Sequence, residues 1–284
     1  MSPEALASQP HPLKIGVFDS GVGGLTVLRA LLPRIPGAEY IYVGDTARLP
    51  YGSKSRATIA RYAVSSARFL VEQGAQFLVI ACNTASALAI EDIRSAAGVP
   101  VLGVIETGAA EARATSETND VLVIATDATV QSHAYAAACG QLGLRALEKA
   151  CPLLVPLVEE GWIEHPVTAE VLDIYLSELL ERAQADGMQA DTLVLGCTHY
   201  PLLRPQIERA VPAGLRVIDS AEATANRVCA ALGIPEESNH DQNERHQSRQ
   251  VRFFATDSTA KFRQLGTRFL GQPIEAVELV DLGG

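Results

Sequence analysis

Two cysteines, Cys82 and Cys197, each follow a short apolar segment, and their thiols are the side chains of this sequence with the most possible chemical roles. Cys82 stands in FLVIACNTA, where Phe77–Ile80 predicts a buried strand, and Cys197 stands in DTLVLGCTHYP after Thr192–Leu195. In both stretches a small residue precedes the cysteine and hydrogen-bonding side chains follow it. Ligands of open parallel sheets bind at the carboxyl ends of the strands, so we expect both thiols to face one pocket.

A pair of thiols can serve as nucleophile, metal ligand, redox couple, or acid and base. Neither cysteine has metal-site spacing, and a single nucleophile would leave the second thiol without a task. A redox pair usually has its cysteines close in sequence, so it stays open as the lesser alternative. An acid–base pair fits best: a thiolate removes a proton from a carbon stereocentre, and the opposite thiol gives a proton to the other face. The ordinary thiol pKa of about 8.5 keeps both forms accessible near neutrality.

The residues beside the cysteines indicate how such a pair would be tuned. Asp19 and His199 are the titratable candidates. Hydrogen bonds to a substrate carboxylate and to a planar intermediate are expected from Ser20, Asn83, Thr84 and Thr198. No lysine stands at a strand end as a Schiff-base partner for pyridoxal phosphate, so no cofactor is expected. The glycine-rich turn Gly21–Gly24 would present backbone N–H groups to an anion, but it lacks the dinucleotide and P-loop patterns.

The composition describes an ordinary globular protein. The chain has 284 residues, 48% of them apolar and 20% charged, which predicts one large or two medium domains. A net charge of −10 argues against a nucleic-acid footprint or a membrane-surface role. The sequence has neither a signal-peptide pattern nor a membrane-spanning apolar run, so a cytoplasmic location is expected. The other cysteines are expected to be small buried side chains without a disulfide or metal role, namely Cys139, Cys151 and Cys229.

Apolar strands alternate with helical patterns along the chain, which predicts an α/β fold. The expected strands are Lys14–Phe18, Tyr40–Val43, Phe77–Ile80, Val101–Val104, Val121–Ile124, Thr192–Leu195, Arg216–Ile218, Val251–Ala255 and Ala276–Val280. The expected helices are Leu25–Leu32, Thr58–Gln73, Ala85–Ala96, an alanine-rich helix after Gly108, Val130–Leu142, Thr168–Ala185 and Ser258–Leu270. Cys151–Glu160 contains two prolines and predicts an edge strand or loop. Met1–Pro12 is expected to be a loose tail, and Pro235–Gln250, with His240 and His246, an exposed loop without ligand function.

The two halves of the chain show corresponding spacings. Asp19 precedes Cys82 by 63 residues, and Thr126 precedes Cys197 by 71. This pattern predicts two similar three-layer α/β lobes with mostly parallel sheets and the active site in the cleft between them. The first lobe is expected to hold residues 1–104 and 219–284, because the C-terminal strands return to it, and the second to hold 105–218.

Four motifs in order resemble the glutamate racemase family. They are FDSGVGGL at Phe18–Leu25, PYG at Pro50–Gly52, ACNTA at Ala81–Ala85 and LGCTHYPL at Leu195–Leu202. The similarity runs from about Lys14 to Asp219, and Phe253–Asp257 fits the C-terminal part of the family. One departure is Ala125, where the family often has glycine.

The resemblance implies cofactor-independent, metal-free interconversion of L- and D-glutamate, which supplies D-glutamate for peptidoglycan, in a protein that forms homodimers. The residues matching catalytic positions are Cys82, Cys197, Asp19, His199 and Glu159, with the adjacent Glu160 as the alternative to Glu159. Those matching substrate-binding positions are Asp19, Ser20, Pro50, Tyr51, Gly52, Asn83, Thr84, Thr126, Thr129, Thr198 and His199. Tyr51 would equally fit a role in covering the core.

Two alternatives remain at this stage. An aspartate or hydantoin racemase would use the same pair of thiols, although the TH after Cys197 and the PYG motif favour glutamate. A two-lobed amino-acid-binding protein without catalysis would keep the cleft but would have no need for both thiols.

Overall fold

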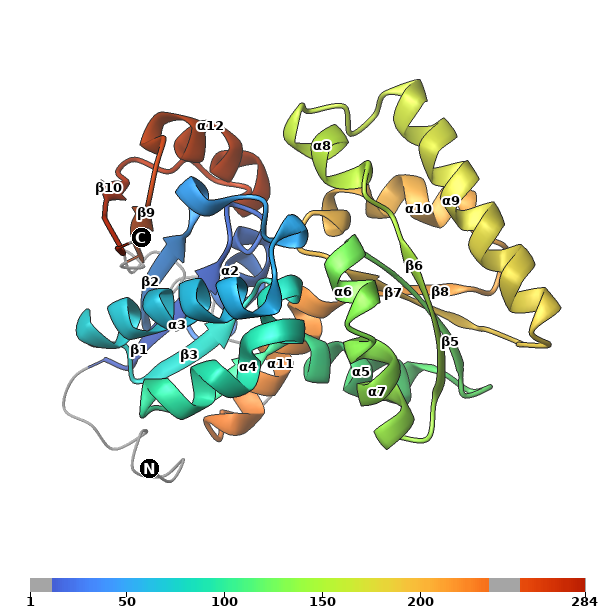
Figure 1. Ribbon diagram of the computed structural model, residues 1–284, viewed down its shortest axis with the longest axis horizontal. Coiled ribbons are helices and arrows are strands. Elements are labelled where there is room, and N and C mark those ends of the chain that lie inside the picture. Colours follow the sequence, from blue (N-terminus) through green and yellow to red (C-terminus); the bar gives the residue numbers. More distant parts are fainter. Residues whose placement is uncertain (1–11, 235–250, 284) are drawn as a thin grey trace.

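The structure, a computed structural model, describes residues 12–234 and 251–283. Its strands form two parallel sheets that lie side by side (Figure 1). The first sheet has the order β10-β9-β2-β1-β3-β4 and is built from β1 (Lys14–Asp19), β2 (Glu39–Gly44), β3 (Phe77–Ile80), β4 (Val101–Gly103), β9 (Val251–Ala255) and β10 (Glu278–Leu279). The second has the order β6-β5-β7-β8 and is built from β5 (Asp120–Ala125), β6 (Arg145–Ala150), β7 (Thr192–Gly196) and β8 (Arg216–Asp219).

Helices cover both faces of each sheet. They are α2 (Leu25–Leu31), α3 (Arg56–Glu72), α4 (Asn83–Ala97), α5 (Val104–Thr115), α6 (Asp127–Gln131), α7 (Ala134–Gln141), α8 (Leu154–Glu159), α9 (Pro166–Ala185), α10 (Arg204–Ala210), α11 (Ser220–Ala231) and α12 (Thr259–Leu270). Three short 3-10 turns lie at Thr46–Arg48, Tyr51–Ser53 and Tyr200–Leu203. This arrangement confirms the predicted α/β fold with mostly parallel sheets.

The alternation of side chains along each strand explains the layers. In β1, Ile15 and Val17 pack with α2 and α12, whereas Phe18 packs with α3 and α4 on the opposite face. In β5, Leu122 and Ile124 pack with α8, α9 and α10, whereas alternate residues of the same strand pack with α5 and α7. Successive strand residues point to opposite faces, so a strand covered on both faces is apolar at nearly every position.

The C-terminal segment pairs with the first sheet, as expected: β9 lies in parallel register with β2, and β10 with β9. The chain passes between the two sheets through α5 and returns through α11, which packs against both α5 and α2. A buried hydrogen bond of 2.7 Å joins Thr107 Oγ1 to Thr224 Oγ1 across these two helices. The lobe boundaries at 1–104 with 219–284 and at 105–218 stay a prediction.

Three local predictions are wrong. The segment 151–160 is not a strand, since Leu154–Glu159 forms α8; the strand at that edge of the second sheet is β6, just before it. Pro156 is the third residue of α8, where a missing N–H costs no intrahelical bond. The helix expected at 130–142 is interrupted at His133, whose φ of 54° is left-handed. The helix α5 begins at Val104, so Gly108 lies within it and not before it.

The predictions of a loose tail at 1–12 and an exposed loop at 235–250 fall almost wholly outside the described residues. Among the described residues, no helix has the length and apolar character that crossing a bilayer demands. All five cysteines lie in the described ranges and are buried, and no disulfide joins any of them.

Candidate active site

Cys82 follows the carboxyl end of β3 and is the N-cap residue of α4. Its sulfur accepts a hydrogen bond from the Ala85 N–H at 3.5 Å and lies 3.3 Å from Ser20 Oγ, to which the thiol donates. The side chain is nearly enclosed, with 5% exposure. Burial, and secondarily the negative charge of Asp19, raise the pKa of the Cys82 thiol to about 12. These effects outweigh the helix N-terminus, so Cys82 is a thiol near neutrality.

Cys197 follows β7 and belongs to a second group of polar side chains. Its Sγ lies 3.9 Å from His199 Nδ1, and His199 Nε2 lies 3.2 Å from Glu159 Oε1 at the end of α8. Burial opposes a charge on His199, but Cys197 and Glu159 prevail and raise the histidine pKa to about 10. In return, the hydrogen bond from His199 lowers the pKa of Glu159. The adjacent Glu160 is exposed, so Glu159 is the carboxylate that meets the histidine.

The glycine-rich turn after β1 touches both cysteine segments. Ser20 contacts Cys82, while a Cβ at Gly23 would lie 2.2 Å from Thr198 Oγ1 and 2.6 Å from His199 Cε1. The hydroxyl of Thr26 donates a hydrogen bond of 3.1 Å to the carbonyl of Thr198. The absence of a side chain at position 23 therefore lets the turn after β1 approach the end of β7 closely.

Asp19 connects the two groups electrostatically. It ends β1, is 2% exposed, and accepts a hydrogen bond of 2.9 Å from the Gly21 N–H. Burial raises the pKa of Asp19, while the charge of His199 lowers it. The same carboxyl raises the pKa of Cys82, so Asp19 influences both cysteine groups.

A cluster of hydroxyls brings the two sheets together beside α4. Thr84 Oγ1 lies 3.1 Å from Thr126 Oγ1, and Thr126 Oγ1 lies 2.9 Å from Thr129 Oγ1. Asn83, next to Cys82, accepts a hydrogen bond of 2.8 Å at Oδ1 from the Tyr135 hydroxyl. Its buried Nδ2 has no hydrogen-bond partner among the described residues. These donors form a polar wall that could receive an anionic group.

The Pro50–Gly52 loop is held in a different way. Tyr51 is 2% exposed and donates a hydrogen bond of 2.6 Å to Asp45 Oδ2, so its ring belongs to the core next to Phe18. Thr256 Oγ1 also donates to Asp45, at 3.0 Å. A Cβ at Gly52 would meet nothing within 4 Å, which leaves the loop's backbone open. The sequence reasoning missed Asp45, although its place after a strand was a usable signal, and it missed Tyr135, for which the sequence holds no signal.

Away from the two cysteines, the structure has a surface pocket, and its described residues offer no candidate metal site. A surface groove of about 580 Å³ runs along α3 beside the segment 281–283 and contains neither thiol. Within the described ranges, no group of three or more His, Cys, Asp or Glu side chains is placed to hold a metal ion.

Comparison with known proteins gives a consistent result. The family model for Asp/Glu/hydantoin racemase matches residues 23–228. Over 98% of this chain and all of its own length, the glutamate racemase of Koribacter versatilis is 52% identical. The crystal structure of the Thermus thermophilus glutamate racemase with β-chloro-D-alanine superposes with a TM-score of 0.80, at 40% identity and 99% coverage of both chains. That of the Francisella tularensis glutamate racemase with D-glutamate gives 0.82, at 34% identity and 96% and 98% coverage.

The similarity to the Koribacter versatilis and Thermus thermophilus proteins extends over nearly the whole chain, so it includes both cysteine segments and both sheets. On this combined evidence of sequence and structure, the chain belongs to the Asp/Glu/hydantoin racemase family and is an isomerase.

Proposed function

We propose that the protein interconverts L- and D-glutamate without a cofactor, by two-base proton transfer between Cys82 and Cys197. The observation that carries this proposal is the position of the two thiols. Each follows the carboxyl end of a strand, β3 or β7, and the Ser20–Gly24 turn contacts both segments. We choose glutamate over aspartate or a hydantoin as the substrate because the proteins similar to this one over nearly the whole chain are glutamate racemases.

The surroundings give the two thiols unequal starting roles. Cys82 is protonated near neutrality because its pKa is about 12. It would therefore enter the reaction as the proton donor. His199, whose pKa is raised to about 10, has its Nδ1 3.9 Å from Cys197 Sγ and would stabilise a thiolate there. Cys197 as thiolate would remove the Cα proton, and Cys82 would donate its thiol proton to the opposite face. The reverse reaction exchanges the two roles.

The carbanion needs stabilisation because no cofactor delocalises its charge. The Asn83 Nδ2 group and the hydroxyls of Thr84 and Thr126 are the candidate donors to the substrate carboxylate, at the positive end of α4. The remaining binding positions proposed for glutamate are Asp19, Ser20, Pro50, Tyr51, Gly52, Thr129, Thr198 and His199. For Tyr51 the contribution would come from the loop backbone, because its hydroxyl is engaged by Asp45. Both thiols are only 5% exposed, and we propose that the two sheets move apart to admit the substrate.

The test is to incubate purified protein with L-glutamate in deuterated water without added cofactor. We expect the Cα proton to be replaced by deuterium and the optical rotation to fall to zero. Aspartate should show neither change. Binding of glutamate without exchange would favour an amino-acid-binding protein, and exchange with aspartate but not glutamate would favour an aspartate racemase.

We propose further that this activity supplies D-glutamate for peptidoglycan in the cytoplasm, and that the protein acts as a homodimer. Complementation of a bacterial strain that depends on external D-glutamate tests the first point. Light scattering of the purified protein tests the second. Failure to restore growth, or a monomeric mass at working concentrations, would contradict the respective proposal.

A further inference from the structure

The side-chain amide of Asn83 is in an unusual position for a buried polar group. Asn83 is 3% exposed and directly follows Cys82, yet its Nδ2 has no partner among the described residues. Burying a hydrogen-bond donor without an acceptor costs free energy of folding, so a ligand that supplies the acceptor would explain its position. Whether Asn83 can donate to a ligand depends on the orientation of its amide, because an amide rotated by half a turn would present an oxygen in place of the NH2 group.

One hydrogen bond decides this orientation. Tyr135, in α7 beside the second sheet, donates its hydroxyl to Asn83 Oδ1 at 2.8 Å. Burial raises the pKa of Tyr135, so the phenol keeps its proton and remains a donor. A phenol can also accept a hydrogen bond, but in this structure it donates to Oδ1, so the NH2 group of Asn83 points away from Tyr135.

The ring of Tyr135 has little freedom to move. A Cβ at Gly108 would lie 3.1 Å from its hydroxyl oxygen, and a Cβ at Gly196 would lie 2.9 Å from its Cε2. The start of α7 is held as well, since Nδ1 of its N-cap residue His133 lies 3.2 Å from Oε2 of the buried Glu148. Gly196 directly precedes Cys197, so this one ring packs against the second cysteine segment while its hydroxyl holds the residue after the first.

We propose that Tyr135 is a positioning residue that fixes the Asn83 amide with its NH2 group toward the substrate carboxylate. The inference rests on the proposed function for the identity of the substrate, but the orientation of the amide does not. Tyr135 touches no reacting atom and acts through Asn83.

The kinetic test compares Tyr135→Phe with Asn83→Ala and the double variant. We expect Tyr135→Phe to raise the KM for glutamate about tenfold with a smaller change in kcat, because it loosens a group that binds ground state and transition state alike. In the Asn83→Ala background the same substitution should change KM less than about twofold, because the amide it positions is gone. An equal effect in both backgrounds would overturn the proposal, since Tyr135 would then act independently of Asn83.

The matched control is Tyr40→Phe. Tyr40 is equally buried and its hydroxyl bonds to the carbonyls of Leu31 and Ile35; it stands near the start of β2, at the end of the first sheet away from Cys82. We expect Tyr40→Phe to lower the melting temperature without a change in KM. A KM effect equal to that of Tyr135→Phe would show that the loss of any buried phenol loosens the site, which contradicts a specific role.

A second readout needs no glutamate. In protein labelled with nitrogen-15 at asparagine, the Asn83 side-chain resonances are those lost in Asn83→Ala. We expect both amide protons to shift in Tyr135→Phe and to stay in place in Tyr40→Phe. Unchanged resonances in Tyr135→Phe would overturn the proposal even if the wild type racemises glutamate. Shifted resonances in a protein that fails to racemise glutamate would refute only the proposed function.

Discussion

His199 Nε2 lies 3.2 Å from Glu159 Oε1, while Nδ1 of the same ring lies 3.9 Å from Cys197 Sγ. The histidine thus stands between a carboxylate and a thiol. Its pKa of about 10 means that the ring is protonated at neutral pH and that its charge is shared between two partners. The contact joins α8 to the end of β7, and it brings a glutamate from a proline-containing segment close to Cys197.

Glu159→Gln should lower the pKa of His199 from about 10, because the carboxylate no longer stabilises the imidazolium. We expect kcat to fall about 10- to 100-fold, the rate equivalent of the roughly 1.5–3 kcal/mol of a charge-assisted hydrogen bond. A histidine with a raised pKa stabilises the fold below its unfolded pKa and loses that effect as pH rises through its folded pKa. The variant should therefore lose its histidine-dependent stability at a lower pH than the wild type. Histidine proton resonances followed over pH measure the shift.

The neighbouring Glu160→Gln is the matched control. Glu160 is exposed at the end of the same helix, so the substitution removes the same charge without the contact. We expect wild-type kcat and an unchanged His199 titration. Equal losses in both variants would mean that net charge, and not the hydrogen bond, determines the effect.

If the proposed mechanism holds, replacing Cys82 or Cys197 should stop racemisation and leave the fold intact. A serine hydroxyl in place of Cys82 or Cys197 is a far weaker base at neutral pH, so we expect kcat to fall at least about 1000-fold in each variant. Cys229→Ala, in the buried face of α11, should retain activity. Circular dichroism and chiral chromatography of the products provide the measurements. Full activity in either serine variant would refute the two-thiol mechanism.

Asp19→Asn should lower the pKa of Cys82, because burial and then the Asp19 charge raise it to about 12. Burial remains, so the fall should be partial. The ultraviolet absorbance of the thiolate, followed over pH and corrected with Cys82→Ser, measures it. An unchanged or higher pKa would show that the carboxyl of Asp19 is neutral in the folded protein and adds no charge to the site.

The sequence predicted the strands that position the site because both faces of these strands are buried and read as apolar runs, as in Phe77–Ile80 and Thr192–Leu195. It did not predict β6, whose sequence RALEKA carries charges. The carboxylate of the buried Glu148 in this strand has its partner in His133, whose Nδ1 lies 3.2 Å from Oε2. Such partners are known only once the chain has folded.

The site shows the same limit. The cysteines were recognisable because each stands between an apolar run and a polar loop. Tyr135 was not, because it sits in an alanine-rich helix and meets Asn83 across 52 positions of sequence. Periodicity indicates that such a tyrosine is buried, but it does not indicate where its hydroxyl points.

Gly23→Ala should abolish activity through a steric effect. The new Cβ would lie 2.2 Å from Thr198 Oγ1 and 2.6 Å from the His199 ring, so the Cys197 segment must shift. We expect a loss of about 1–3 kcal/mol in the free energy of unfolding, as for other overpacked sites. Gly37→Ala, where a Cβ meets nothing within 4 Å, should leave activity and stability nearly unchanged. Urea denaturation and the racemisation assay report the two effects. Wild-type activity in Gly23→Ala would show that the turn need not approach Thr198 so closely.

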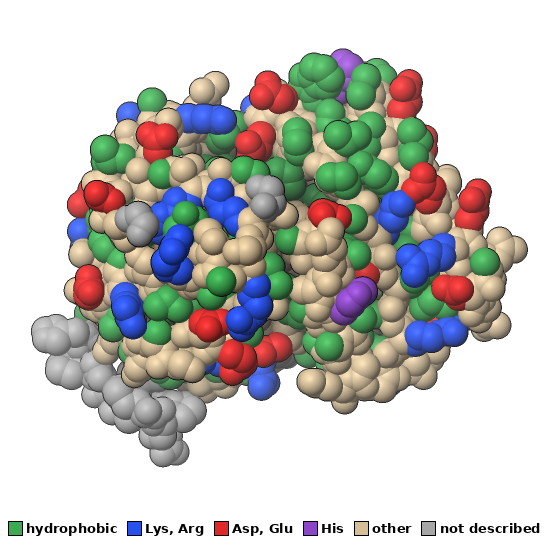
Figure 2. All heavy atoms as spheres, viewed as in Figure 1, with side chains coloured by type: hydrophobic (Ala, Val, Ile, Leu, Met, Phe, Trp, Pro, Cys, Tyr) green, Lys and Arg blue, Asp and Glu red, His purple; other side chains and the backbone are tan. Residues whose placement is uncertain are grey.

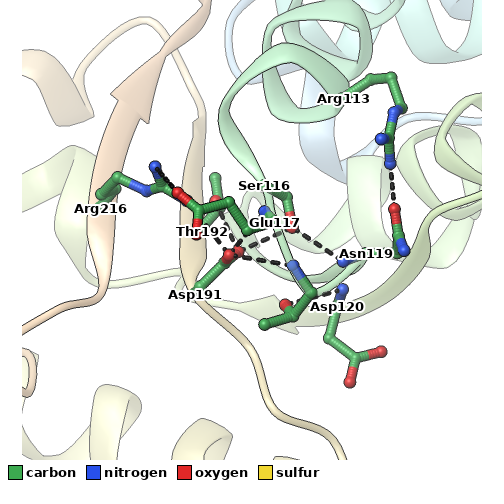
Figure 3. Close-up of polar contacts among 9 residues, drawn as sticks. Arg113, Ser116, Glu117, Asn119, Asp120, Asp191, Thr192 and Arg216 are labelled. Atoms are coloured by element: carbon green, nitrogen blue, oxygen red, sulfur yellow. Dashed lines mark hydrogen bonds and ion pairs between the residues drawn. The ribbon is translucent and has the colours of Figure 1, made fainter.

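The last prediction concerns stability at the opposite end of the second sheet. Asp191 precedes β7 and accepts hydrogen bonds from the Ser116 hydroxyl at 2.7 Å and the Glu117 N–H at 2.7 Å, while Arg216 lies 3.1 Å away (Figure 3). Burial opposes ionisation of this carboxyl, but the hydrogen bonds prevail and hold its pKa well below the ordinary range. The acidic group thus fixes the turn between α5 and β5.

Asp191→Asn should lower the free energy of unfolding by about 1–3 kcal/mol at neutral pH, because the turn's donors lose a charged acceptor. A carboxyl with a depressed pKa stabilises the fold above its unfolded value of about 3.9 and loses this effect as pH falls toward the folded value. The difference between wild type and variant should therefore narrow at about pH 3. Urea midpoints at both pH values measure it, with the exposed Asp173→Asn of α9 as control. A difference that stays constant with pH would show that the hydrogen bonds are made equally well by a neutral amide, and that the ionised carboxylate is not what holds the turn.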